Sequence, residues 1–122
     1  MRPADSFTVL IVSDDAAAAA LLGGLVETLG YAVQFSSARA AADRVRQTRP
    51  RIAMLDCTGD CDEASIARTL MRGVAVVLVG PARLLTEMRD VASRYGVEMV
   101  FTPPDPGPLG DVLDRAARRT NV

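Results

Sequence analysis

Five apolar segments alternate with five segments of helical periodicity, and this alternation constrains the fold more than any other feature of the chain. The predicted strands cover residues 7–12, 32–35, 52–55, 74–79 and 99–102, and each is followed by a predicted helix. Short connections between alternating strands and helices require parallel strands, with helices covering both faces of the sheet. The pattern therefore predicts an α/β fold with a doubly wound, five-stranded parallel sheet.

Apolar stripes and typical end residues define the predicted helices. Asp14 or Asp15 can cap the first helix, Ser37 precedes the second, and Gly30 and Gly96 follow the first and fourth. We expect these stripes to face the sheet: Leu21, Leu22, Leu25, Val26 and Leu29; Ala38, Ala41, Ala42 and Val45; Ile66, Leu70 and Met71; Leu84, Leu85, Met88, Val91, Ala92 and Tyr95; Leu109, Val112, Leu113, Ala116 and Ala117. The Gly23–Gly24 pair weakens the first helix by about 2 kcal/mol relative to alanines, so packing must compensate.

Composition excludes several classes of function. The chain has no histidine, and all 14 of its basic residues are arginines, so imidazole and lysine chemistry are both excluded. A net charge of −1 gives no general attraction to nucleic acid or to anionic membranes. No apolar run approaches the roughly 20 residues of a membrane span. We expect residues 1–122 to form one cytoplasmic domain that binds neither nucleic acid nor membrane.

Three carboxylates follow the predicted strands. Asp14 and Asp15 come after the first strand, and Asp56 ends the third. These strands are neighbours in a doubly wound sheet, so the carboxylates should converge at its carboxyl edge. Clustered carboxylates repel one another unless a cation lies between them, and Mg²⁺ is the natural occupant. A carboxylate beside Mg²⁺ can attack phosphorus and form an aspartyl phosphate.

These segments resemble the receiver domains of response regulators over nearly the whole chain. The matching stretches are residues 11–15, 29–31, 49–56, 76–80 and 102–104. The resemblance implies a flavodoxin-like (βα)5 fold with strand order 2-1-3-4-5. It also implies that Asp56 is the phosphoacceptor, and that Asp14, Asp56 and the backbone carbonyl of Thr58 are the magnesium ligands.

Several positions depart from the family's pattern. Ser13 replaces one member of the acidic pair, and Asp15, one place later, is an alternative ligand. Gly80 replaces the hydroxyl residue, Pro103 the lysine and Val100 the aromatic switch residue. Without the ammonium and the hydroxyl, a phosphoryl group would be poorly stabilised and its conformational readout would be lost. We interpret the chain as a degenerate, or pseudo-, receiver that binds Mg²⁺ weakly at most.

The preferred function is a non-enzymatic module of two-component or phosphorelay signalling that acts independently of phosphorylation. It would dock a protein partner, namely a kinase or an output protein, or form a homodimer. The resemblance implies docking through the fourth helix, fifth strand and fifth helix, where we expect Leu84, Leu85 or Leu109 to be partly exposed. An independent enzyme is disfavoured, because no nucleophile–base pair or phosphate-binding glycine loop is visible.

Two alternatives remain open. The chain can be a working receiver, phosphorylated on Asp56 by a kinase with atypical chemistry. It can also be a thiol redox sensor through Cys57 and Cys61, although a structural disulfide is not expected in a cytosolic chain. Two cysteines are too few for a zinc site. The arginines of residues 44–51 are interpreted as a solvated face.

Overall fold

The computed structural model describes residues 8–58 and 61–119. Its strands are β1 (Thr8–Val12), β2 (Ala32–Ser36), β3 (Ile52–Asp56), β4 (Ala75–Pro81) and β5 (Glu98–Thr102). Its helices are α1 (Ala16–Thr28), α2 (Ala41–Thr48), α3 (Glu63–Met71), α4 (Leu85–Tyr95) and α5 (Pro106–Arg119), with a short 3₁₀ helix, η2 (Ala82–Leu84), before α4. All strand pairs are parallel, in the order β2-β1-β3-β4-β5. The predicted flavodoxin-like doubly wound fold is therefore confirmed.

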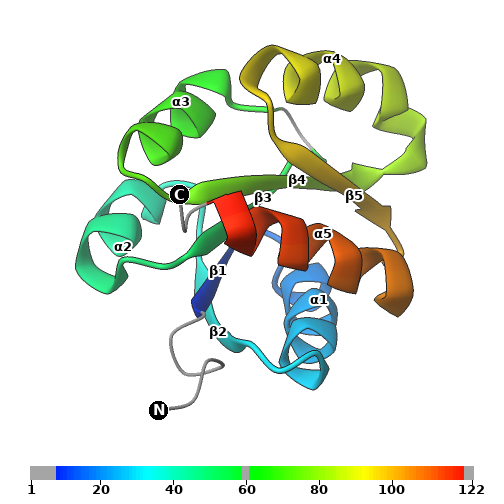
Figure 1. Cartoon of the computed structure of the whole chain (residues 1–122), viewed down its shortest axis with the longest axis horizontal. Coiled ribbons are helices and arrows are strands. Elements are labelled where there is room, and N and C mark those ends of the chain that lie inside the picture. Colours follow the sequence, from blue (N-terminus) through cyan, green and yellow to red (C-terminus); the bar gives the residue numbers. More distant parts are fainter. Residues whose placement is uncertain (1–7, 59–60, 120–122) are drawn as a thin grey trace.

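The sheet separates two hydrophobic cores (Figure 1). Val9 and Ile11 of β1 face α1 and α5, whereas Leu10 and Val12 face α2, α3 and α4. The central strands β1, β3 and β4 are buried on both faces, which explains their continuous apolar sequences. Among residues 8–58 and 61–119, no helix has both the length and the apolar character needed to cross a bilayer.

The carboxyl edge of the sheet brings the candidate residues together. The loop after β1 lies beside the end of β3, because these two strands pair directly. β4 extends two residues beyond its predicted end, because Gly80 and Pro81 align with Phe101 and Thr102 of β5. The positions that follow all three central strands therefore share one edge.

Three details differ from the predicted helices. α2 begins at Ala41 rather than soon after Ser37, because a turn closed by the Ala40 amide donating to Ser37 Oγ (3.1 Å) comes first. The amide of Ala38 donates to Asp14 Oδ1 over 3.0 Å. Leu21 and Met71 are 75% and 85% exposed rather than in the core. Ala42 is exposed as well. These three side chains lie beside the buried face of their helices. On α1 the buried face consists of Ala19, Leu22, Gly23 and Val26.

Gly23 is explained by its contact with the edge strand. A Cβ atom at this position would lie 2.5 Å from Cζ of Phe35, whose ring packs onto α1. A Cβ atom at Gly24 would meet nothing within 4 Å. The low helix propensity of Gly23 is therefore offset by ring packing, whereas that of Gly24 is not.

The two glycines should respond oppositely to alanine. We expect Gly24→Ala to raise the free energy of unfolding by about 0.5–1 kcal/mol through helix propensity. Gly23→Ala should lower it by about 1 kcal/mol, because the ring of Phe35 must move. Urea unfolding of both variants measures the difference. A gain of stability in Gly23→Ala would contradict the packing account.

Candidate functional site

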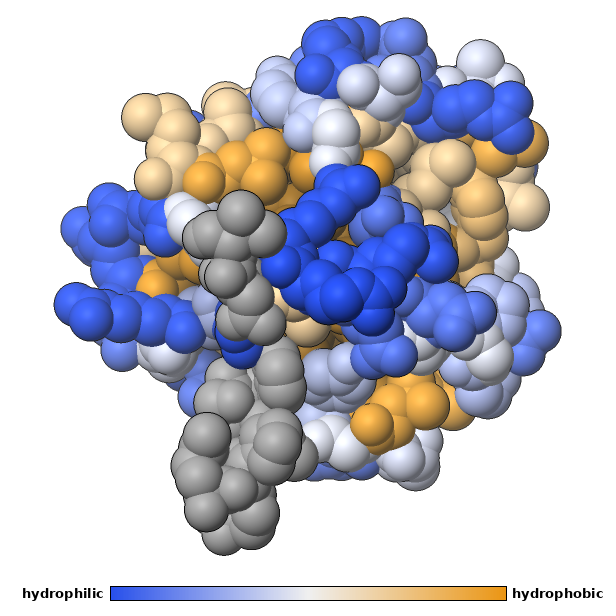
Figure 2. Space-filling model, in the orientation of Figure 1, coloured by the Kyte–Doolittle hydropathy of each residue, from blue (hydrophilic) through white to orange (hydrophobic). Residues whose placement is uncertain are grey.

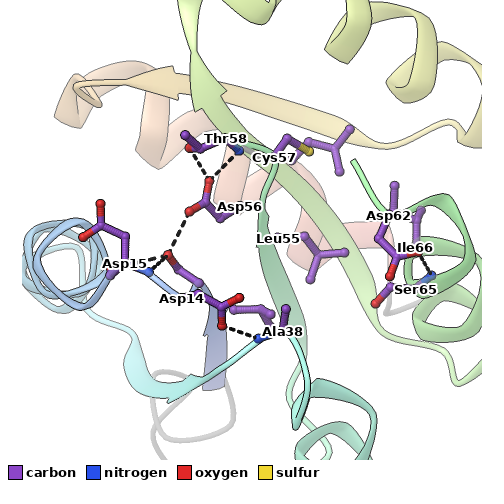
Figure 3. Close-up of a pocket in the computed structure, with 13 residues that line it drawn as sticks. Asp14, Asp15, Ala38, Leu55, Asp56, Cys57, Thr58, Asp62, Ser65 and Ile66 are labelled. Carbon is purple, nitrogen blue, oxygen red and sulfur yellow. Dashed lines mark hydrogen bonds between the residues drawn. The ribbon is translucent and has the colours of Figure 1, made fainter. Parts of the chain in front are cut away.

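Asp56 lies half-buried at the end of β3, in a cavity of about 380 Å³ (Figure 3). The loop after β1 contributes Ser13, Asp14 and Asp15 to its wall. Residues of α3 and its N-terminal cap form the opposite wall, and Thr58 follows Asp56 at the rim. The structure therefore gathers the predicted site residues of the first and third strands around one cavity.

The carboxylate of Asp56 accepts hydrogen bonds from its own chain on both oxygens. Ser13 Oγ donates to Oδ2 over 2.8 Å. The Thr58 amide and hydroxyl donate to Oδ1 over 2.8 Å and 2.5 Å. These bonds compensate the carboxylate for the water it loses. Ser13, at the family's second acidic position, acts here as a donor.

The other two carboxylates have separate structural roles (Figure 3). Asp15 caps α1, with Oδ1 accepting from the Ala18 amide over 3.1 Å. Asp14 points toward Ala38 and accepts its amide hydrogen. Three carboxylates predicted to converge thus bind three different groups of donors.

This arrangement does not fit a magnesium ion. Mg²⁺ requires near-octahedral oxygen coordination at short distances, usually with one or two carboxylates directed at it. Asp14 and Asp15 are engaged by backbone amides, and Asp56 by Ser13 and Thr58. Across the described part of the chain, no three acidic or cysteine side chains lie close enough together to hold a metal ion. The Thr58 carbonyl stays a predicted ligand.

Gly80 leaves space that a buried side chain of α4 fills. A Cβ atom on Gly80 would lie 2.8 Å from Sδ of Met88, which is 0% exposed, and 3.7 Å from Cβ of Cys57. A serine or threonine at this position would therefore displace Met88. The family's switch hydroxyl is replaced by thioether packing.

The other two substituted positions are also apolar. Val100 is 7% exposed and belongs to the core between the sheet, α1 and α5. Pro103 follows a cis peptide bond and lines a second cavity of about 410 Å³ beside Asp56. Leu21, Pro81 and Pro104 also line this cavity, and Arg83 is the cationic side chain among its described lining residues. Pro103, which the resemblance places at the family's lysine, contributes an apolar side chain to this cavity.

Cys57 and Cys61 form a disulfide, so the expectation that they would not is wrong. Their Cα atoms are 4.6 Å apart, within the usual range for a disulfide. The bond joins Cys57, directly after β3, to Cys61, directly before Asp62, the cap of α3. A spacing of four residues in the sequence does not by itself reveal this approach.

An ionic network beside the disulfide joins α3 to α4. Arg94 of α4 forms an ion pair with Glu63 of α3. It forms a second ion pair, over 2.6 Å, with Asp90 of its own helix. The Tyr95 hydroxyl donates to Glu63 Oε1 over 3.1 Å. The hydrogen bond from Arg94 lowers the pKa of Glu63, and burial followed by the bond to Glu63 raises the pKa of Tyr95. No local sequence pattern indicates this network, because Glu63 is 31 residues from Arg94 and 32 from Tyr95.

The face formed by α4, β5 and α5 is largely charged. Leu84 and Leu85 are partly exposed, as predicted, but the expectation for Leu109 is wrong because it is 0% exposed. Leu109 packs into the core formed by α1, α5 and the sheet. Arg115 and Arg119 bind Glu98 on this face. Hydrophilic side chains accordingly gather over α5 in Figure 2.

Solved structures with the same architecture are receiver domains and proteins linked to pilus assembly. A signal receiver domain of a modulated diguanylate cyclase from Desulfovibrio desulfuricans is similar with a TM-score of 0.79 and 24% identity, over 93% of this chain and 95% of that chain. A candidate pilus assembly protein (cpaE) from Burkholderia thailandensis has a TM-score of 0.75 and 31% identity, over 92% and 98%. A candidate pilus assembly-related protein from Burkholderia pseudomallei has a TM-score of 0.74 and 29% identity, over 98% and 95%. No protein-family model and no curated protein matches the chain.

The contact between Gly80 and Met88 predicts a pairwise effect on stability. Gly80→Thr should lower the free energy of unfolding by about 1–3 kcal/mol, because it overpacks a buried site. The double variant Gly80→Ala, Met88→Val should lose less free energy of unfolding than the two single variants lose in sum. The reason is that valine at position 88 leaves room for the Cβ atom at position 80. Denaturant unfolding of the unaltered protein, the two single variants and the double variant tests this coupling. Additive effects would show that Met88 does not constrain position 80.

Proposed function

Because this chain belongs, by its fold, to the receiver domains of response regulators, we propose that it is a signal-transduction module that docks a protein partner without being phosphorylated. It is not itself an enzyme, and it acts in the cytoplasm. The working receiver with atypical chemistry is the alternative that the experiments below must exclude.

One observation carries the proposal: Asp56 already accepts three hydrogen bonds from Ser13 and Thr58. Attack on a phosphoryl donor would require the carboxylate to give up part of this set. The product would then carry charge on its phosphoryl oxygens, which receivers balance with a cation and a lysine. The chain contains no lysine, and Asp14 and Asp15 are engaged by backbone amides. The hydrogen bonds of the free carboxylate and the unbalanced charge of the aspartyl phosphate therefore both disfavour phosphorylation.

The docking surface we propose is α1 rather than the charged face of α4, β5 and α5. α1 exposes only small or apolar side chains over its first nine residues: Ala16, Ala17, Ala18, Ala20, Leu21 and Gly24. Phe35, 47% exposed, extends this surface across Gly23. A helix that is apolar all round is normally covered on all sides. Covering α1 with a partner would remove this apolar surface from water.

The partner we propose belongs to a pilus-assembly apparatus. The two similar structures with 29% and 31% identity are the candidate pilus assembly proteins, whereas the receiver domain of the diguanylate cyclase is 24% identical. Sequence similarity thus favours the pilus context over the other receiver contexts.

Complementation of a deletion strain of the source organism tests the function. We expect deletion of the gene to reduce surface pili, counted by electron microscopy. Asp56→Asn should restore pili as well as the unaltered gene does, because the proposed action needs no phosphoryl group. Failure of Asp56→Asn at normal protein levels would favour the working receiver. Normal pili in the deletion strain would refute the pilus context.

Two matched variants, each replacing an exposed alanine by arginine, test the docking surface. Ala17→Arg on α1 should abolish the restoration of pili, because a buried unpaired charge weakens an interface by about tenfold or more. Ala42→Arg, at an exposed position of α2, should leave restoration unchanged. Thermal unfolding should give the same midpoint for both variants. Equal activity of the two would exclude α1 as the docking surface.

A further inference from the structure

The disulfide between Cys57 and Cys61 has no part in the proposed docking function. Cys57 directly follows Asp56, is 2% exposed, and donates its amide to the Val79 carbonyl over 2.7 Å. Cys61 is partly exposed and directly precedes Asp62, the cap of α3. The bond therefore ties the end of β3 to the start of α3, immediately beside the candidate site.

A groove gives small molecules access to this bond. A cavity of about 310 Å³ reaches both cysteines from between α3 and α4. Its lining includes three carboxylates, from Glu63, Glu87 and Asp90, and one guanidinium, from Arg94. Negative charge in a cleft attracts cationic reagents and repels anionic ones.

We propose that Cys57 and Cys61 are a reversible thiol–disulfide couple that exchanges with low-molecular-weight thiols and disulfides through this groove. Disulfides in cytosolic proteins are usually transient and often redox-sensing, which fits a cysteine pair in a chain of this kind. The proposal does not depend on docking by α1 or on the pilus context. It assigns the two cysteines a modification site of their own.

The oxidation balances as two successive exchanges. The Cys61 thiolate attacks a small disulfide, forms a mixed disulfide and releases one small thiolate. The Cys57 thiolate then attacks Sγ of Cys61 and releases the second small thiolate. The two cysteines lose two electrons and two protons in total, and the small disulfide is reduced to two thiols. Cys61 reacts first because Cys57 is the more buried of the two.

The bond has two structural consequences. Thr58 lies inside the ring that the disulfide closes, so its two hydrogen bonds to Asp56 depend on the ring. Glu63, two residues after Cys61, pairs with Arg94. Reduction should therefore loosen both the bonds to Asp56 and the contact between α3 and α4.

A redox titration of the full chain tests the proposal. The protein is equilibrated with reduced and oxidised glutathione at varying ratios, free thiols are trapped by alkylation, and the products are weighed by mass spectrometry. We expect one two-electron transition, accompanied by amide NMR shifts at Thr58, Glu63 and Arg94. Cys61→Ser should show no transition, and Asp111→Asn on α5 should keep it. Thiols that stay free at every ratio, a bond that resists reduction until the protein unfolds, or shifts confined to the cysteines would each overturn the proposal.

Charge selectivity tests the route of access. Reduced protein at low ionic strength should be oxidised several-fold faster by cystamine, which is cationic, than by oxidised glutathione, which is anionic. The difference should shrink in Glu87→Gln, because one carboxylate of the groove is removed. A variant with the matched change outside the groove, Asp111→Asn on α5, should keep the full difference. Equal rates for both reagents with the unaltered protein would exclude the groove as the entry route.

Discussion

The hydrogen bonds that Ser13 and Thr58 donate to Asp56 hold the carboxyl edge of this receiver together. Ser13 follows β1 and Thr58 follows β3, so both loops meet on the carboxylate that ends β3. The same loops direct Asp14 and Asp15 to the amides of Ala38 and Ala18. Asp56, which the resemblance assigns to magnesium and phosphate, therefore accepts hydrogen bonds from both loops.

Packing on both faces of the sheet accompanies these hydrogen bonds. Met88 occupies the space beside Gly80, and Val100 is part of a core rather than a mobile aromatic. In receivers, phosphorylation acts by shifting such elements between two arrangements. Interiors packed this closely have little room for a second arrangement. Under the proposed function, the substitutions would remove both the stabilisation of the phosphoryl group and the means of responding to it.

The fold was predictable because its signals are local and repeated: buried strands are continuously apolar, and helices end at Gly30 and Gly96. The departures at Ser13, Gly80, Val100 and Pro103 were visible by resemblance, but what replaces the missing groups was not. That Met88 fills the space at Gly80, or that Phe35 covers Gly23, depends on side chains from distant elements. The disulfide and the exposure of Leu21 escaped prediction for a related reason. Residue spacing shows neither that two cysteines come into contact nor which apolar residues of a helix are buried against the sheet.

The most direct test of the central claim is an amide NMR titration of the chain with Mg²⁺, followed by Mg²⁺ with beryllofluoride, which imitates a phosphoryl group on a carboxylate. If Asp56 keeps its hydrogen bonds to Ser13 and Thr58, neither addition should shift the amide resonances of Asp56, Gly80 or Val100. The reference is the shift that the same concentration of salt causes on its own. Concerted shifts at these three positions would mean that the site binds the phosphoryl mimic and transmits it through β4 and β5. That result would make the chain a working switch and would contradict the account.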